Sequence, residues 1–112
     1  MTKSILTGSP VSANRRLIPA KGRLVSSVLY RSKLEEWQWE AKSQYRDSPK
    51  TGDVVLDVII YYPNLKSDLD GSLKLIFDAL TGVLYEDDKQ ITEFTAHKWV
   101  DRENPRVEIR LL

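Results

Sequence analysis

Four acidic residues and a lysine, gathered within 21 residues, are the side chains of this sequence that could do chemistry. Asp68 and Asp70 stand two residues apart, Lys74 follows four residues later, and Asp87 and Asp88 are adjacent. Carboxylate oxygens are the ligands that Mg²⁺ prefers, and an ammonium group can hold a phosphate beside the metal. This combination is typical of a site that cleaves a phosphodiester with the help of a divalent cation.

The spacing of these residues allows one shared site or several separate structural roles. An extended approach to a helix would point Asp68 and Asp70 the same way, and Lys74 would follow one helical turn later. A helix of about a dozen residues is about 18 Å long, so Asp87 and Asp88 join them only if the chain folds back. Alternatively, the acids cap a helix and form a turn, and Lys74 makes an i,i+4 ion pair. The complete set favours a shared site.

Two helices and several strands are predicted around these residues. Apolar residues spaced by three and four predict a helix that begins at Ser26 or Ser27 and ends before Ser48, and a second helix over 70–81 with Gly82 as its C-cap. A β-branched run predicts an inner strand at 54–62. Further strands are expected at 5–8, 91–100 and 107–111, with turns or loops at 9–22 and 101–105.

This order, β-α-β-α-β-β, predicts an α/β (α+β) fold. The mixed sheet would carry two main helices in a single layer, and its last two strands would be joined by a hairpin-length turn. With 112 residues, of which 41% are hydrophobic, the chain fits one small domain over 1–112. It has no cysteine, which excludes disulfides, thiolate zinc sites and cysteine nucleophiles.

Hydropathy and the distribution of charge indicate which partners the chain can bind. No apolar run approaches the roughly 18 residues of a membrane span, and the start lacks the apolar region of a signal peptide, so we expect a soluble, cytoplasmic protein with no membrane partner. Residues 1–50 hold ten Lys or Arg against four Asp or Glu, and residues 51–112 hold seven against twelve. A basic half beside an acidic site suits a polyanionic substrate, although these charges could also mix over an ordinary surface.

Two other acidic motifs share part of the pattern. An EF-hand loop with Gly71 at its sixth position would place Lys66 and Phe77 where calcium ligands are required. The nucleophile motif of haloacid-dehalogenase-type phosphatases matches from Asp68 to Leu73, but five residues separate it from the preceding predicted strand. Such a phosphatase also needs a longer doubly wound domain.

The full pattern resembles the RusA-type Holliday-junction resolvases, small endodeoxyribonucleases that are common in phages and prophages. This resemblance implies a homodimer that binds a four-way DNA junction and nicks two strands symmetrically with Mg²⁺, or with Mn²⁺ in its place. The likeness covers nearly the whole chain and is carried by residues 8–14 with Arg16, by 21–23, and by Asp68-Leu69-Asp70, Lys74, Asp78-Ala79-Leu80, Gly82 and Asp87-Asp88-Lys89-Gln90-Ile91.

Carried over residue by residue, the resemblance implies that Asp68, Asp70 and Asp88 bind the metal and that Lys74 is the essential lysine. Asp87 would be a neighbour of the metal ligands. These four residues, Asp68, Asp70, Asp88 and Lys74, are therefore the expected catalytic set.

One residue departs from the family pattern. The position after the second Asp is usually Asn, whereas this chain has Gly71, which offers no side-chain amide to orient a carboxylate. We expect an effect on rate or metal affinity, with activity retained. The alternatives are a non-catalytic junction-binding or DNA-binding module with a decayed site, and a phosphatase with Asp68 as its nucleophile.

Basic and aromatic residues are candidates for contact with DNA. The expected phosphate contacts are Arg15, Arg16, Lys21 and Arg23 in the early loop and Lys66 beside the acids. Each could equally be an ordinary surface charge. Among the aromatic residues, we expect Trp37 and Trp99 in the core or at a dimer surface, Trp39 at an interface or on DNA, and His97 as a strand residue with no catalytic role.

Overall fold

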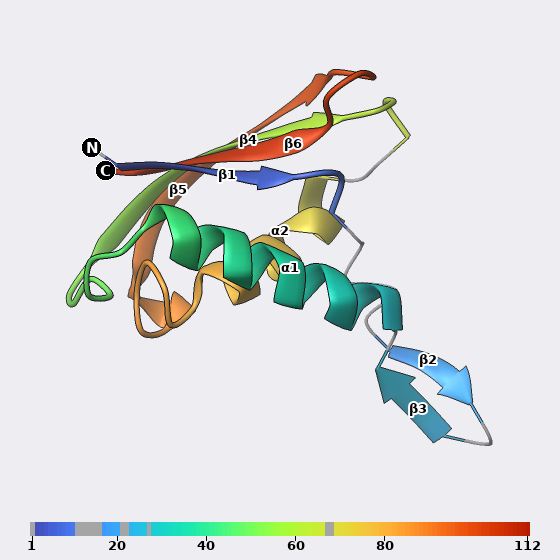
Figure 1. Cartoon of the computed structure of the whole chain (residues 1–112), viewed down its shortest axis with the longest axis horizontal. Coiled ribbons are helices and arrows are strands. Elements are labelled where there is room, and N and C mark those ends of the chain that lie inside the picture. The colour runs from blue at the N-terminus through green and yellow to red at the C-terminus, as the bar shows by residue number, and fades with distance from the viewer. Residues whose placement is uncertain (1, 11–16, 21–22, 27, 67–68) are drawn as a thin grey trace.

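Two helices cover one face of a four-stranded mixed sheet (Figure 1). The computed structural model describes residues 2–10, 17–20, 23–26, 28–66 and 69–112. β5 runs parallel to β4, and the other two pairings are antiparallel. The predicted α+β fold with two main helices is confirmed. The sheet order is β1-β6-β4-β5, formed by β1 (Thr2–Thr7), β6 (Arg106–Leu111), β4 (Val54–Tyr62) and β5 (Ile91–Val100).

The central strand β4 separates the two faces of the sheet by strict alternation. Its even-numbered residues, from Val54 to Tyr62, are fully buried, and the residues between them are only partly buried. These buried side chains form one core with apolar residues of the two helices, α1 (Val28–Gln44) and α2 (Leu69–Leu80). β4 is therefore an inner strand, as its apolar, β-branched sequence predicted.

Each helix is held to the sheet by a buried polar contact as well as by its apolar face. The indole Nε1 of Trp37, which is fully buried on α1, donates to the carbonyl oxygen of Thr7 at 2.8 Å. The hydroxyl groups of Ser72 on α2 and Tyr62 at the end of β4 hydrogen-bond to each other, and both residues are buried. These contacts fix α1 beside β1 and fix the first turns of α2 at the end of β4.

A two-stranded hairpin replaces most of the predicted early loop. β2 (Leu17–Ala20) and β3 (Arg23–Ser26) pair antiparallel and project beyond the start of α1 (Figure 1). The prediction of a loop through Pro19 is wrong, because apolar and β-branched residues flank a connection of only two residues, which favours a hairpin. Pro19 is tolerated because a two-stranded ribbon leaves one edge of each strand unpaired.

The turn over 101–105 does not form a hairpin between β5 and β6. β4 lies between those two strands, so the hairpin-length turn joins strands that are not neighbours in the sheet. β6 instead crosses the end of β4 and pairs antiparallel with its other edge, so in the described part of the chain β5 is an edge strand. The backbone N–H of Asp101 donates to the Tyr62 carbonyl oxygen at 2.8 Å as the chain crosses the end of β4.

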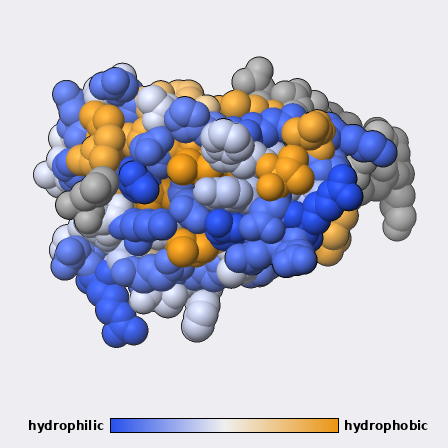
Figure 2. Space-filling view, turned by 90° about the horizontal axis from the view of Figure 1, so that it is seen from above, coloured by the Kyte–Doolittle hydropathy of each residue, from blue (hydrophilic) through white to orange (hydrophobic). Residues whose placement is uncertain are grey.

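The face of the sheet opposite the helices carries a charged cluster. Arg106 donates to Asp101 and to Glu108, each at 2.9 Å, and Lys3 lies 3.2 Å from Glu108. The Arg106 guanidinium also lies 3.9 Å from the ring centroid of Tyr61. Figure 2 views this side, where hydrophobic side chains form separate patches among hydrophilic ones. In the described part of the chain, no helix has the length and hydropathy needed to cross a membrane.

Candidate active site

An acidic cleft lies where the end of α2 meets α1 and the segment before β5. Its volume is about 380 Å³. Two of its residues come from the predicted acidic motif, and the others come from the helices. The cleft is lined by Gln38 of α1, by Asp78 and Thr81 at the end of α2, and by Asp87 and Asp88.

A tight reversal after α2 brings Asp88 back to the helix. Gly82 has a φ of 83°, a left-handed conformation that glycine adopts without strain. Its N–H donates to the Tyr85 carbonyl oxygen at 2.7 Å, and the Leu84 N–H donates to the Leu80 carbonyl oxygen at 3.0 Å. The chain therefore reverses direction directly after α2, as a site shared by both acidic pairs requires. Gly82 lies at the C-cap position of α2, as predicted.

Gln90 anchors the short 3₁₀ helix η2 (Asp88–Gln90) to the rest of the domain. Its Oε1 accepts hydrogen bonds from the backbone N–H groups of residues 86–87, at 2.9 and 3.0 Å. Its Nε2 donates to the carbonyl oxygens of Lys50, at 2.8 Å, and Gly52, at 2.9 Å. One side chain thus joins the segment 50–52 to the segment 86–87, and fixes the backbone on both sides of Asp88.

The two adjacent acids have different roles. Asp87 is the N-cap of η2, and its Oδ1 accepts the backbone N–H of Lys89 at 2.9 Å. This hydrogen bond lowers the pKa of Asp87 and keeps its carboxyl group ionised. The structural alternative considered from sequence is therefore correct for Asp87, while Asp88, which is exposed, lines the cleft beside it.

Asp78 joins the cleft to α1 and to the predicted catalytic lysine. Lys74 Nζ donates to Asp78 Oδ1 at 2.9 Å, and the hydroxyl of buried Tyr30 donates to Asp78 Oδ2 at 3.1 Å. Lys74 thus makes an i,i+4 pair of the kind that was weighed as an alternative, with the acid one turn later in the helix. The Lys74 side chain is 43% exposed, and such a pair contributes about 0–1 kcal/mol, so its ammonium group can turn toward a bound phosphate.

The negative potential of the cleft extends to a buried tyrosine. Burial raises the pKa of Tyr85, and the charges of Asp88, Asp78 and Asp87 raise it further. The Tyr85 hydroxyl donates to the Phe77 carbonyl oxygen at 2.8 Å. The charges of all three carboxylates therefore act on the same buried hydroxyl group.

The described carboxylates do not by themselves form a metal centre. No group of three metal-ligating side chains is present among the residues that the structure describes. Asp68 lies outside the described residues; the backbone of Asp70 is in the first turn of α2, and its side chain is also outside them. Asp70 and Asp78 are eight residues apart, about 12 Å along the helix axis. A metal site shared with Asp88 thus depends on how the Asp68 and Asp70 side chains extend along α2.

A comparison with protein families decides the class of this chain. The family model described as Endodeoxyribonuclease RusA matches residues 7–112. The chain belongs to the RusA family. This match covers essentially the whole domain, and it confirms the resemblance that the acidic motifs predicted. No individual curated protein matches the chain.

Membership of the RusA family makes an endodeoxyribonuclease the enzyme class and DNA the substrate class. Most of the predicted DNA contacts cannot be compared with the geometry of the cleft, because Arg15, Arg16 and Lys21 lie outside the described residues. Arg23 is the first residue of β3, and its side chain is also outside the described part. Lys66 is exposed in the segment before α2, where its backbone N–H donates to Asn64 Oδ1 at 2.9 Å.

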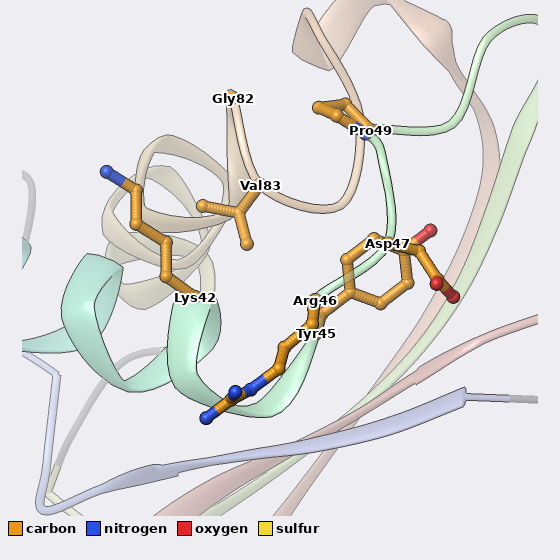
Figure 3. A pocket seen from close by; sticks show the side chains of 7 residues that line it. All are labelled: Lys42, Tyr45, Arg46, Asp47, Pro49, Gly82 and Val83. Carbon is orange, nitrogen blue, oxygen red and sulfur yellow. The ribbon is translucent and has the colours of Figure 1, made fainter.

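A second hollow, of about 410 Å³, continues along α1 from the acidic cleft (Figure 3). Lys42 lines it one helical turn after Gln38, and Gly82 lines it directly after Thr81, so the two hollows adjoin. In Figure 3 the side chain of Lys42 extends to the upper left and that of Arg46 to the lower left, while Asp47 points to the right, away from both. Sequence reasoning missed these cations; their spacing of four residues at the end of a predicted helix was the available signal.

The three tryptophans and His97 differ in how far they are buried. Trp37 is fully buried, which confirms it as a core residue. Trp99 is 57% exposed on β5, so the core alternative for this residue is wrong and the dimer surface stays a prediction. Trp39 is 72% exposed on α1, and its proposed contact with a partner or DNA also stays a prediction. His97 is an exposed residue of β5, as expected.

Proposed function

We propose that this RusA-family chain is a Holliday-junction resolvase that depends on a divalent cation, Mg²⁺ or Mn²⁺, and acts as a homodimer. The match to the RusA family over residues 7–112 carries the proposal. It is supported by the acidic cleft, in which Asp88 is exposed beside Asp78, the residue that pairs with Lys74. The family match also argues against the phosphatase alternative, which has no support in the two-layer, four-stranded fold.

In this proposal the carboxylates of Asp68, Asp70 and Asp88 would hold the cation. When bound, it would neutralise charge on the phosphodiester and activate water. Gln90 keeps the backbone of Asp88 in place, and Lys74 exchanges its ion pair with Asp78 for the negative charge that develops on the phosphate. Asp78 holds the lysine in reach until substrate binds.

We also propose that Lys42 and Arg46 extend the phosphate-binding surface beyond the early basic residues. Lys42 lies about 6 Å along the α1 axis from Gln38 of the acidic cleft. The axial rise of one DNA strand is about 3.4 Å per nucleotide, so a strand cut at the cleft would present its phosphate two nucleotides away to Lys42. Arg15, Arg16, Lys21, Arg23 and Lys66 stay the other proposed contacts.

The test is cleavage of a labelled four-way junction and a linear duplex, with Mg²⁺ or EDTA, on a denaturing gel. We expect paired, symmetric nicks in the junction alone that are lost with EDTA and in Asp70→Asn and Asp88→Asn. Glu103→Gln removes one negative charge from an exposed turn residue and should cut normally. Junction binding without nicks in the unmodified protein would refute the nuclease and identify a binding module, with Gly71 as the first suspect.

A further inference from the structure

The two outer edges of the sheet differ in how their backbone is protected. At the β1 edge, side chains of α1 hydrogen-bond to the strand. Gln44 donates to the carbonyl oxygen of Ile5 and accepts its N–H, each at 2.7 Å. Glu40 accepts the Thr7 N–H at 2.8 Å. This edge is therefore blocked to another strand.

The β5 edge is longer and lacks this protection. β5 has ten residues with no proline or glycine, and its pairing with β4 is continuous from Val55 and Glu93 to Tyr62 and Val100. Seven of its ten residues are exposed. Over 92–97, the structure places no hydrogen bond on the strand backbone from any described residue outside the β4 ladder. A long, regular, exposed edge of this kind pairs readily with a further strand.

The side chains of β5 identify a second copy of this chain as that strand. If two copies pair antiparallel about a two-fold axis at Thr95, Glu93 lies opposite the partner's His97, and the same contact recurs across the axis. In such a pair, opposite residues lie on the same face of the sheet and their Cβ atoms are about 5 Å apart. Trp99, which is 57% exposed in the single chain, lies on the same face of β5 as Glu93 and His97.

A neighbouring register is less favourable. With the axis at Ala96, Glu93 would face the partner's Trp99 and Phe94 would face the partner's Lys98, so each charge would lie against an apolar side chain. Successive residues of a strand point to opposite faces of the sheet. A shift of the axis by half a residue would therefore place the helical face of one copy beside the open face of the other, and only axes that pass through a residue keep each face on its own side. Pairing of Glu93 with a polar imidazole instead of an indole therefore favours the axis at Thr95 over the axis at Ala96.

We infer that two copies of this chain pair along β5, with Thr95 at the two-fold axis, to form one continuous eight-stranded sheet. This inference rests on the homodimer in the proposed function and assigns its surface. β5 begins directly after η2, so each acidic cleft adjoins one end of the paired strands. The first residue of each β5 lies four residues from the axis, about 13 Å along the strand. Two clefts related in this way face the two strands of a symmetric substrate.

The experiment uses introduced cysteines, since the chain has none. Thr95→Cys should form a covalent dimer on a non-reducing gel, because the two copies of this residue face each other at the axis. Thr92→Cys is the matched control on the same strand, and its two copies would lie six residues apart, about 20 Å, so it should not cross-link. A Thr95→Cys variant that behaves like Thr92→Cys would overturn the inference.

A charge exchange tests the register in a second way. By sedimentation velocity, Glu93→Lys should raise the dissociation constant of the dimer at least tenfold, and adding His97→Glu should restore it. An unchanged dimer in Glu93→Lys, checked for folding by circular dichroism, would place the interface elsewhere. Junction nicking is measured in a separate assay. Symmetric nicking without a Thr95 cross-link would overturn the assignment of the dimer surface alone. A cross-linked dimer that never nicks the junction would overturn the proposed function alone.

Discussion

Removing the two cations of the second hollow should change how junction binding depends on salt. The double variant Lys42→Ala, Arg46→Ala deletes two candidate phosphate contacts beside the acidic cleft. Each phosphate contact contributes about 0.9 to the slope of log K against log salt, so we expect the slope to fall by about 1.8. Between 50 and 200 mM salt, the variant should then lose about tenfold less affinity than the unmodified protein.

The measurement is a titration of a labelled four-way junction by fluorescence anisotropy at five or more salt concentrations, without divalent cation. A matched control is Arg102→Ala, Arg110→Ala, which makes the same change in net charge at exposed residues of the turn after β5 and of β6. This control should lower affinity at low salt only slightly and leave the slope unchanged. An unchanged slope in the Lys42, Arg46 variant, or an equal change in the control, would refute a local phosphate contact.

Three further changes test the site, the core and the charged face. Gln90→Ala should lower the steady-state rate of junction cleavage about 10- to 100-fold, because the backbone of Asp88 loses its anchor. The circular dichroism spectrum should stay native, and full activity would contradict this role of Gln90. Trp37→Ala should cost about 3–5 kcal/mol in the free energy of unfolding by urea, and a loss below 1 kcal/mol would show that the site repacks. Hydrogen bonds from Arg106 lower the pKa of Asp101, and those from Arg106 and Lys3 outweigh burial and lower the pKa of Glu108. Their contribution to stability is therefore present above the unfolded pKa values of about 4 and is lost as pH falls below them. The unmodified protein should be more stable than Arg106→Gln at pH 5, and this difference should shrink toward pH 3. A difference in urea midpoint that stays constant over this range would contradict the prediction.

The main elements could be predicted because each has a strong local signal. The alternation in β4 and the three-and-four spacing on both helices set which face is buried before any tertiary contact forms. The hairpin β2–β3 was missed because proline and glycine outweighed the short apolar runs on either side of the turn. The order of the strands could not be predicted for another reason: a five-residue connection fits a hairpin as well as a crossing over the end of β4, and the sequence does not decide between them.

The acidic motif was recognisable from residue types, but the division of labour within it was not. Asp87 and Asp88 look alike in sequence, and only the capping contacts of η2 show that one carboxylate supports the backbone while the other lines the cleft. Asp78 is the residue that sequence reasoning failed to assign a role. It lies one turn after Lys74, and this spacing could have suggested the ion pair.

The acidic cleft and its cations lie on the helical side of the sheet, whereas the proposed dimer edge runs along its margin. α2 belongs to both regions, because its C-terminal half carries Asp78 and its Phe77 ring packs edge-on against Phe94 of β5, with 5.2 Å between ring centroids. A change at the β5 edge therefore reaches the cleft through one aromatic contact. Phe94→Ala should weaken junction cleavage more than Trp99→Ala if that contact positions the acids, even where both variants weaken the dimer. Equal cleavage by the two variants, at matched dimer fractions, would show that the edge serves pairing alone.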